Sequence, residues 1–212
     1  DINIVDGKVK SVTVNGEDIK CENLILAIGH SARDTYEMLF KKGMQMNTKP
    51  FAIGVRVEHP QLMINESQYG EIYANHPRLK AAEYKLTYKT KDNRGVYSFC
   101  MCPGGVVVAA SSEEERLVVN GMSYHARDKE NANSAVVVTV GEKDFGSHPL
   151  DGMEFQRHYE SLAYKLGGSN YDAPIQTLGD FMNDKVSEKL GEVNPSITTG
   201  FKFASLKDAL PN

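Results

Sequence analysis

Apolar and polar residues alternate in the first part of the chain, as they do in half-buried β-strands. The alternation is clearest between Val9 and Val14, and it is flanked by Asp6-Gly7 and Asn15-Gly16. Both dipeptides are strong signals for tight hairpin turns. We therefore predict an antiparallel meander over residues 2–28 that leads into a short apolar strand, Leu24 to Ile28.

A short helix is expected next, at about residues 35–42. Asp34 can cap it, Glu37 completes a capping-box pattern, and Gly43 suits its C-terminal end. A boundary follows near Lys49-Pro50.

The remainder of the chain is rich in strand-like segments separated by Gly, Pro, Asn and Asp, which favours an antiparallel or mixed sheet. Later segments have helical spacing, from Asp151 to Gly167 and from Thr177 to Lys189. A capping-box pattern, Asp151 to Glu154, opens the first, and Thr177 is the expected cap of the second, with Asp180 at the third position. We predict an α+β fold with two parts, 1–48 and 49–212. The expected strands are 51–57, 83–88, 96–101, 106–110, 117–120 and 135–140.

The composition argues against several classes of protein. The chain has 212 residues, 41% of them hydrophobic, and a net charge of −4, which does not favour nucleic acid as the main partner. No apolar run approaches the ~18 residues of a membrane span. The chain has only three cysteines, and an odd number cannot all pair within one molecule. This count argues against a disulfide framework and favours a cytoplasmic location. The chain begins without Met inside an expected strand, so we expect a longer parent protein.

The turn at Gly29 is the first candidate for ligand binding. A small residue and a glycine at the end of a strand let the backbone approach a ligand closely, and the following helix start favours anions. The structural alternative is that Gly29 only ends a strand in a tight turn.

The segment 49–60 is a predicted strand with charges at one end. Alternation puts Arg56 and Glu58 on the same face as Gly54. Arg56 and His59 could hold an anionic or carbonyl substrate, since a guanidinium suits carboxylates. Alternatively, Arg56 and Glu58 pair with neighbours, and His59 is a turn residue before Pro60.

The segment 99–105 carries Cys100 and Cys102, which alternation would place on one face. They could be thiols beside a flavin or half of a soft-metal site, but no further cysteine cluster supplies the other ligands, so no metal site is expected. We favour two small buried side chains beside a glycine turn that exposes backbone to ligand. His125, His148 and His158 share no metal-binding spacing.

Two polar stretches remain. A loop is expected around 120–133, with Asn120, Arg127 and Asn133, and such a loop either binds ligand or is a solvated connection. A basic stretch, 78–94, could contact nucleic acid, although no aromatic platform accompanies it.

Four motifs in order carry a family resemblance, which covers about residues 20–185. They are Ala-Ile-Gly-His-Ser-Ala-Arg-Asp (27–34), Lys-Pro-Phe-Ala-Ile-Gly-Val-Arg-Val-Glu-His-Pro-Gln (49–61), Tyr-Ser-Phe-Cys-Met-Cys-Pro-Gly-Gly (97–105) and Asn-Gly-Met-Ser (120–123). The chain resembles the bacterial FAD-dependent dehydrogenases, uncharacterised proteins also described as NAD(FAD)-utilising. The resemblance implies a Rossmann-type FAD domain, of which 1–48 would be a part, and a substrate or cap domain inserted into it, 49–212.

The resemblance also implies roles for individual residues. Gly29, His30, Ser31 and Arg33 would bind FAD, and Arg56, Cys102, Gly104 and Gly105 would bind a small-molecule substrate. His59 is the candidate acid or base, and NAD(P) is a further electron partner. The chain has no Gly-x-Gly pair for a phosphate cradle, so we expect it to need the remainder of the parent FAD domain and to be inactive alone. The alternatives are a non-catalytic binding domain and a flavoprotein that acts on RNA.

Overall fold

The structure, a computed structural model, describes residues 1–211 and divides into two compact units at Asn47/Thr48. The first unit comprises Asp1–Asn47, and the second begins at Thr48. Each unit has its own sheet, and each is described separately.

The first unit contains the predicted meander. Strands β1 (Ile2–Val5), β2 (Lys8–Val14) and β3 (Glu17–Lys20) form an antiparallel sheet in that order. Helix α1 (Arg33–Lys41) follows, and the amide of Gly43, at φ 78°, donates to the carbonyl of Phe40 at 2.9 Å. The predicted glycine end of the helix is confirmed.

The cap predicted at the start of α1 is wrong. The N-cap is Ala32, and no side chain accepts a capping hydrogen bond. Asp34 lies inside the first turn, where its carboxylate accepts from the amide of Thr35 at 2.8 Å. A carboxylate inside the first turn still interacts favourably with the helix dipole. Asp34 therefore favours the start of the helix, although not as its N-cap.

The strand expected at residues 24–28 does not form. The segment has no regular secondary structure, and Ile25 is 91% exposed. A strand exists only through its ladder of backbone hydrogen bonds, and no described strand pairs with these residues. The apolar sequence therefore presents its side chains to solvent.

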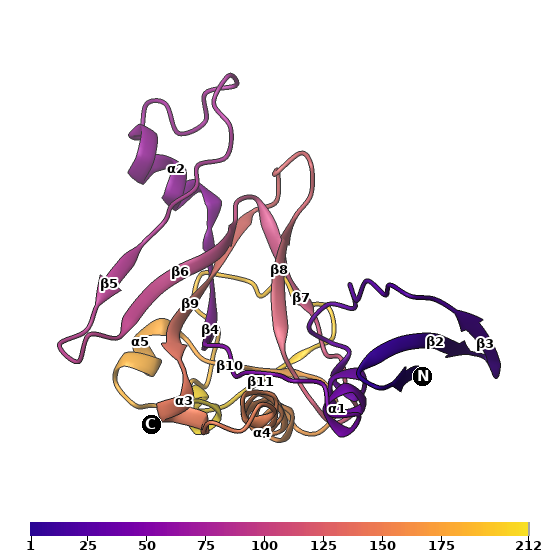
Figure 1. The fold of residues 1–212 in the computed structure, drawn as a ribbon. Coiled ribbons are helices and arrows are strands. Elements are labelled where there is room, and N and C mark those ends of the chain that lie inside the picture. The colour runs from indigo at the N-terminus through magenta and orange to yellow at the C-terminus, as the bar shows by residue number, and fades with distance from the viewer. Residues whose placement is uncertain (212) are drawn as a thin grey trace. The chain divides into compact units, whose positions relative to one another are not determined.

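The second unit is built on a four-stranded antiparallel sheet with the order β4-β9-β6-β5 (Figure 1). The strands are β4 (Phe51–Pro60), β9 (Asn131–Val140), β6 (Gly95–Cys102) and β5 (Thr87–Lys89). An antiparallel ribbon of β7 (Gly105–Ala109) and β8 (Val119–Ser123) packs against β4, β6 and β9. The predicted strands are confirmed in type, and β5 is the one that falls furthest short of its expected length.

Helices and a short parallel pair complete the second unit. The pair is β10 (Ala173–Ile175) with β11 (Phe201–Phe203), and neither strand was predicted. The helices are α2 (Gln61–Tyr69), α3 (Glu142–Phe145), α4 (Asp151–Leu166), α5 (Leu178–Met182) and the 3-10 turn η1 (Leu206–Ala209).

The two predicted helices differ in outcome. Helix α4 has the expected length, although Leu150 is its N-cap and the expected capping box is absent. Helix α5 is shorter than the predicted 177–189, but its cap is confirmed, because the hydroxyl of Thr177 accepts from the amide of Asp180 at 3.3 Å.

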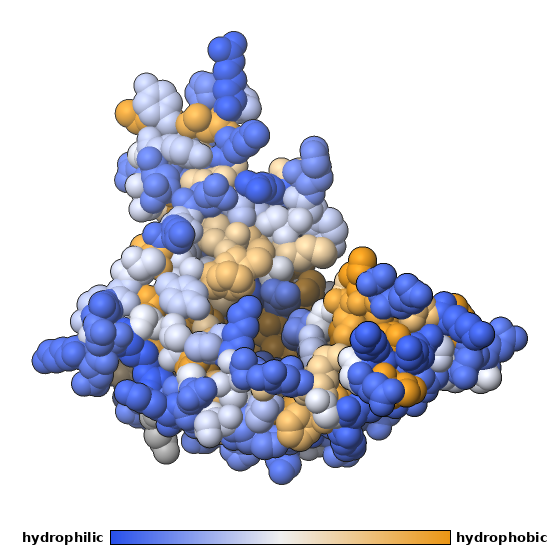
Figure 2. All heavy atoms as spheres, in the orientation of Figure 1, coloured by the Kyte–Doolittle hydropathy of each residue, from blue (hydrophilic) through white to orange (hydrophobic). Residues whose placement is uncertain are grey.

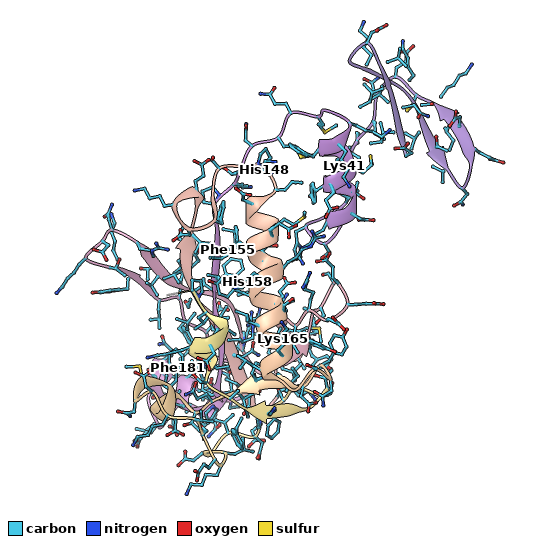
Figure 3. The ribbon with its side chains drawn as sticks, turned by 90° about the horizontal axis from the view of Figure 1, so that it is seen from below. Lys41, His148, Phe155, His158, Lys165 and Phe181 are labelled. Carbon is cyan, nitrogen blue, oxygen red and sulfur yellow. The ribbon has the colours of Figure 1, made fainter. Side chains whose placement is uncertain are left out.

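Strand β9 lies at the centre of the packing. Ala132 and Val140, near its ends, are essentially inaccessible to solvent. Near Val140, Phe51 stacks on Phe145 with centroids 5.4 Å apart, and Phe155 meets Phe51 edge-on at 6.0 Å. Figure 3 shows Phe155 projecting from α4 toward the sheet. This aromatic cluster anchors α4 beside the end of the β4–β9 pair.

Among residues 1–211, no helix combines the length and the apolar character that crossing a membrane would need.

We predict that Gly54→Ala destabilises the chain and Gly95→Ala does not. A Cβ at Gly54 would overlap the carbonyl oxygen of Val136 and lie 2.8 Å from the Cα of Val137, inside the β4–β9 pair. A Cβ at Gly95 would meet only the hydroxyl of Thr139, at 3.5 Å. Denaturant unfolding should show a loss of about 2–3 kcal/mol for the first variant, the upper range of overpacking. Equal free energies of unfolding for both variants would contradict this.

Candidate functional site

The side chain of Arg56 is the centre of a polar cluster that joins four strands. From β4, its Nη1 donates to Oδ1 of Asn133 on β9 at 2.7 Å and to the carbonyl of Cys100 on β6 at 3.3 Å. Its Nη2 donates to Oδ1 of Asn120 on β8 at 3.3 Å. We call Arg56, Asn120, Asn133, Cys100 and Cys102 the Arg56 cluster.

Burial shapes the electrostatics of the cluster. It lowers the pKa of Arg56, while the neighbouring thiols of Cys102 and Cys100 oppose that change. An arginine stays protonated in proteins, so the guanidinium keeps its charge. Gly121 makes room for it: a Cβ there would overlap Nη1 of Arg56 and Oδ1 of Asn133. The close approach of β8 therefore requires glycine at this position.

Two donors of the cluster lack acceptors. Asn133 is completely buried, and its Nδ2 has no hydrogen-bond partner within residues 1–211; the same is true of Nε of Arg56. Buried polar atoms without partners are rare in folded proteins and call for a ligand or an ordered water. Both atoms are donors, so a complementary ligand group is an acceptor, such as a carboxylate, a carbonyl or a phosphate oxygen.

His59 belongs to a different network. Its Nε2 lies 2.9 Å from the hydroxyl of Tyr84, and the side chain of Ser134 also bonds to that hydroxyl. Burial lowers the pKa of His59, against weaker opposition from nearby backbone carbonyls and Glu58, and burial raises the pKa of Tyr84. Which of the two groups donates in this contact depends on the tautomer of the imidazole.

Nδ1 of His59 is buried and makes no hydrogen bond to the part of the chain described. The hydrogen-bond networks of His59 and Arg56 share no residue, although the charge of Arg56 also acts on Tyr84. Alternation along β4 directs the side chains of Arg56 and His59 to opposite faces. The structure therefore does not join the two predicted substrate residues in one site. A role for His59 as acid or base stays a prediction.

The turn Cys102–Gly105 is buried rather than exposed. The amide of Gly104, at φ 47°, donates to Oε1 of Gln61 at 2.7 Å, and a Cβ there would overlap the carbonyl of Arg127. Gly105 begins β7 and pairs with Ser123. The expectation that this turn exposes backbone is wrong, because its backbone groups form contacts inside the fold. Gly104 bonds to the first residue of α2, and Gly105 pairs with β8. Substrate binding by Cys102, Gly104 and Gly105 stays a prediction.

The two cysteines do not share one environment. Cys102 is buried, as expected, but Cys100 is exposed and has a left-handed φ of 49°. The β6–β9 register shifts between Phe99 and Cys102, so simple alternation does not hold there. The prediction of two buried thiols is correct for Cys102 and wrong for Cys100.

The predicted FAD residues lie together in the first unit: Gly29, His30 and Ser31 precede α1, and Arg33 is its first residue. Gly29 has φ 70°, and its carbonyl accepts from the hydroxyl of Tyr36 at 2.9 Å. His30 and Ser31 are exposed, whereas Arg33 is 4% exposed. An exposed turn before a helix fits one edge of a nucleotide. Whether these residues bind FAD stays a prediction.

The polar stretch 120–133 contains strand residues at both ends. Asn120 and Asn133 belong to β8 and β9, and the loop between them lines a cleft of about 1040 Å³ with α2 and residues 74–81. Figure 2 shows hydrophilic and hydrophobic side chains together on this face of the second unit, and the cleft is lined by both kinds. Basic Lys80, Arg127 and Lys129 face acidic Asp128 and Glu130 there, so the walls have no single sign of charge.

Sequence reasoning missed Tyr84, and it named Asn133 without recognising that this residue lies on a strand. Asn133 was assigned to a loop because asparagine is common in turns. The available signal was the alternation of Asn131, Asn133 and the valines that follow, which marks one continuous strand. In the described part of the chain, no group of three or more His, Cys, Asp or Glu side chains could hold a metal ion.

Two comparisons with known proteins bear on this site. A family model described as "FAD-dependent protein, C-terminal domain-like" matches residues 50–212, almost the whole second unit. An uncharacterized protein of Clostridium beijerinckii is 68% identical over 209 residues, which are 98% of this chain and 39% of that protein. The chain thus spans about two-fifths of the length of this relative.

We predict that His59 makes the chain less stable in mild acid. Because its pKa is lower in the folded state than the ordinary 6.5, the unfolded chain binds the extra proton as pH falls below that value. The free energy of unfolding should therefore decrease below about pH 6.5. His59→Gln should flatten this dependence in denaturant titrations at several pH values. The exposed His125→Gln serves as the control, and an equal effect of both variants would contradict the prediction.

Proposed function

Because this chain belongs to the family of FAD-dependent proteins with the C-terminal-like domain, we propose that it forms the substrate side of a longer FAD-dependent oxidoreductase of the dehydrogenase type. The proposed substrate is a small molecule with a carboxylate or carbonyl group. NAD(P) is the proposed electron partner. The proposal extends the family assignment, and the Arg56 cluster is the observation that supports it most directly.

The cluster has the properties of a binding site for an acceptor group. A fixed positive charge and an unpaired amide donor are held on neighbouring strands, in a place that excludes most water. An electrostatic attraction is stronger in such surroundings than in bulk solvent. These donors are already buried without partners, so a ligand oxygen that reaches them gains hydrogen bonds that the protein alone does not form.

These contacts support a separate role for each group. FAD, when bound, supplies the hydride chemistry. Arg56 and Asn133 bind and orient the substrate oxygen, and the fixed β4–β9 pair keeps them in position. The neutral imidazole of His59 is a second candidate to move a proton, through Nδ1. The exposed Gly29 turn, with His30, Ser31 and Arg33, would hold one edge of the nucleotide.

The segment 24–28 supports association with the remainder of an FAD domain. Ile25 is 91% exposed, and Leu26 and Ile28 are 40% and 38% exposed. A contiguous run of apolar side chains with strand-forming character is expected to be covered by a partner. We propose that this run becomes a strand of the FAD domain in the parent protein, directly before the Gly29 turn.

Two other functions were considered from the sequence. A non-catalytic binding domain is favoured by the missing Gly-x-Gly pair. An RNA-acting flavoprotein would use the basic stretch 78–94, but the mixed charge of the neighbouring cleft does not support it. Retention of flavin by the parent would argue against the non-catalytic binding domain. Salt-sensitive RNA binding would favour the RNA-acting flavoprotein.

We predict that the parent protein purifies with FAD bound and that Ile25→Asp weakens this binding. In the 212-residue chain alone, the same change should alter the free energy of unfolding by less than about 0.5 kcal/mol, as for an exposed site. In the parent it would place a charge in a strand and lower the flavin content measured by absorbance. Ile72→Asp, at a site 89% exposed, is the matched control. A colourless parent that takes up no added FAD would refute the oxidoreductase proposal.

We predict that Arg56→Gln weakens binding of small carboxylates to this chain. Succinate and acetate should raise the melting temperature of the wild type, because a ligand that binds only the folded state stabilises it. Loss of one charged hydrogen bond is expected to weaken binding about 10- to 100-fold. The exposed Arg78→Gln makes the same charge change outside the cluster and should bind normally. If the two variants respond alike, Arg56 has no such role.

A further inference from the structure

Cys100 lies at an irregularity of β6 that no packing requirement explains. It is exposed, its φ is 49°, and the register against β9 shifts between Phe99 and Cys102. A left-handed conformation is uncommon for a residue with a side chain and costs on the order of 1 kcal/mol or more. Strain of this kind is often kept where it serves a function.

The irregularity brings the two thiols of Cys100 and Cys102 into contact. In a regular strand, Cα atoms two residues apart are separated by about 6.6 Å, near the upper limit for a disulfide. Here the chain bends: Sγ of Cys102 donates to the carbonyl of Cys100 at 3.3 Å, and the two side chains also interact with each other. The backbone is therefore already shaped toward a bond between the two sulfur atoms.

Arg56 gives this pair a chemical asymmetry. Its guanidinium interacts with both side chains. Cys102 is buried, and desolvation raises the pKa of its thiol. Cys100 is open to solvent beside the same positive charge, so an incoming oxidant reaches Cys100 first.

We propose that Cys100 and Cys102 form a reversible disulfide in response to peroxide. Cys100 is the residue that peroxide attacks, and Cys102 is the resolving thiol. This proposal goes beyond the proposed oxidoreductase function and does not depend on FAD or on a substrate. It assigns a redox role to the two thiols at the bend in β6, whereas the substrate-binding proposal uses the Cys100 carbonyl as an acceptor for Arg56.

The chemistry balances in two steps. The thiolate of Cys100 attacks one oxygen of hydrogen peroxide, the O–O bond breaks, and Cys100 sulfenic acid and hydroxide form. The thiol of Cys102 then attacks the sulfur of the sulfenic acid, the S–S bond forms, and the released hydroxyl leaves as water with the thiol proton. Peroxide is reduced by two electrons, both supplied by the thiol pair. A dithiol reductant reverses the change.

Both cysteines lie in one tryptic peptide, residues 95–116, which makes the product simple to observe. After the 212-residue chain is treated with hydrogen peroxide, this peptide should lose the mass of two hydrogen atoms and resist alkylation by iodoacetamide. Dithiothreitol should restore both thiols. Oxidation of Met101 in the same peptide adds an oxygen atom and is distinguished by mass.

Variants assign the two roles. Cys100→Ser should abolish the loss of mass, and Cys21→Ser, which changes the remaining cysteine, should leave it unchanged. Cys102→Ser should leave a sulfenic acid on Cys100 that dimedone traps.

The proposal is overturned if the wild-type peptide gains only oxygen atoms, or if only disulfides between two molecules form. It is also overturned if Cys21→Ser prevents the change. Cys102 is buried and its substitution could impair folding, but the wild type and the exposed Cys100→Ser decide the question without it. Circular dichroism checks that each variant used is folded.

Discussion

The pairing of β4 with β9 is the constraint on which the second unit depends. All ten residues of β4 find a partner, from Phe51 opposite Val140 to Pro60 opposite Asn131. A slip by one residue would turn every side chain of a strand to the other face. Such a slip would separate Arg56 from Asn133 and would also break the contact in which Asn131 donates to Glu58 at 2.9 Å. The ladder therefore fixes the geometry of the polar cluster before any ligand is considered.

The cost of this arrangement is concentrated in the first part of β9. Asn131, Asn133 and Ser134 are buried where apolar residues would give more stability. Asn131 is satisfied by Glu58 and by the carbonyl of Asn194, but Asn133 keeps an unpaired donor. The other end of the same strand, at Val140, is apolar and packs near the aromatic residues of α3 and α4. One strand thus combines an apolar, well-packed end with a polar end that we propose binds ligand.

The sequence predicted those elements that depend on residues close to one another in the chain. The meander, α4 and the Thr177 cap follow from turn dipeptides, helical spacing and capping chemistry within a few residues. The strand at 24–28 was predicted wrongly because pairing depends on residues far away or outside the chain. For the same reason, the separate hydrogen-bond partners of Arg56 and His59 became visible only in the folded chain, since Asn133 and Tyr84 lie far from β4 in the sequence. Burial of Gly104 likewise depends on Gln61, whose helix had no sequence signal.

The exposed run from Leu24 to Ile28 has a practical consequence for the isolated chain. Apolar segments with strand propensity, no proline and no charge tend to pair with copies of themselves when their proper partner is missing. Residues 24–28 carry no charged side chain, and the turn of Gly29 follows them at once. Self-association through this segment would depend on protein concentration, and the aggregates would have β-structure while the second unit stayed folded.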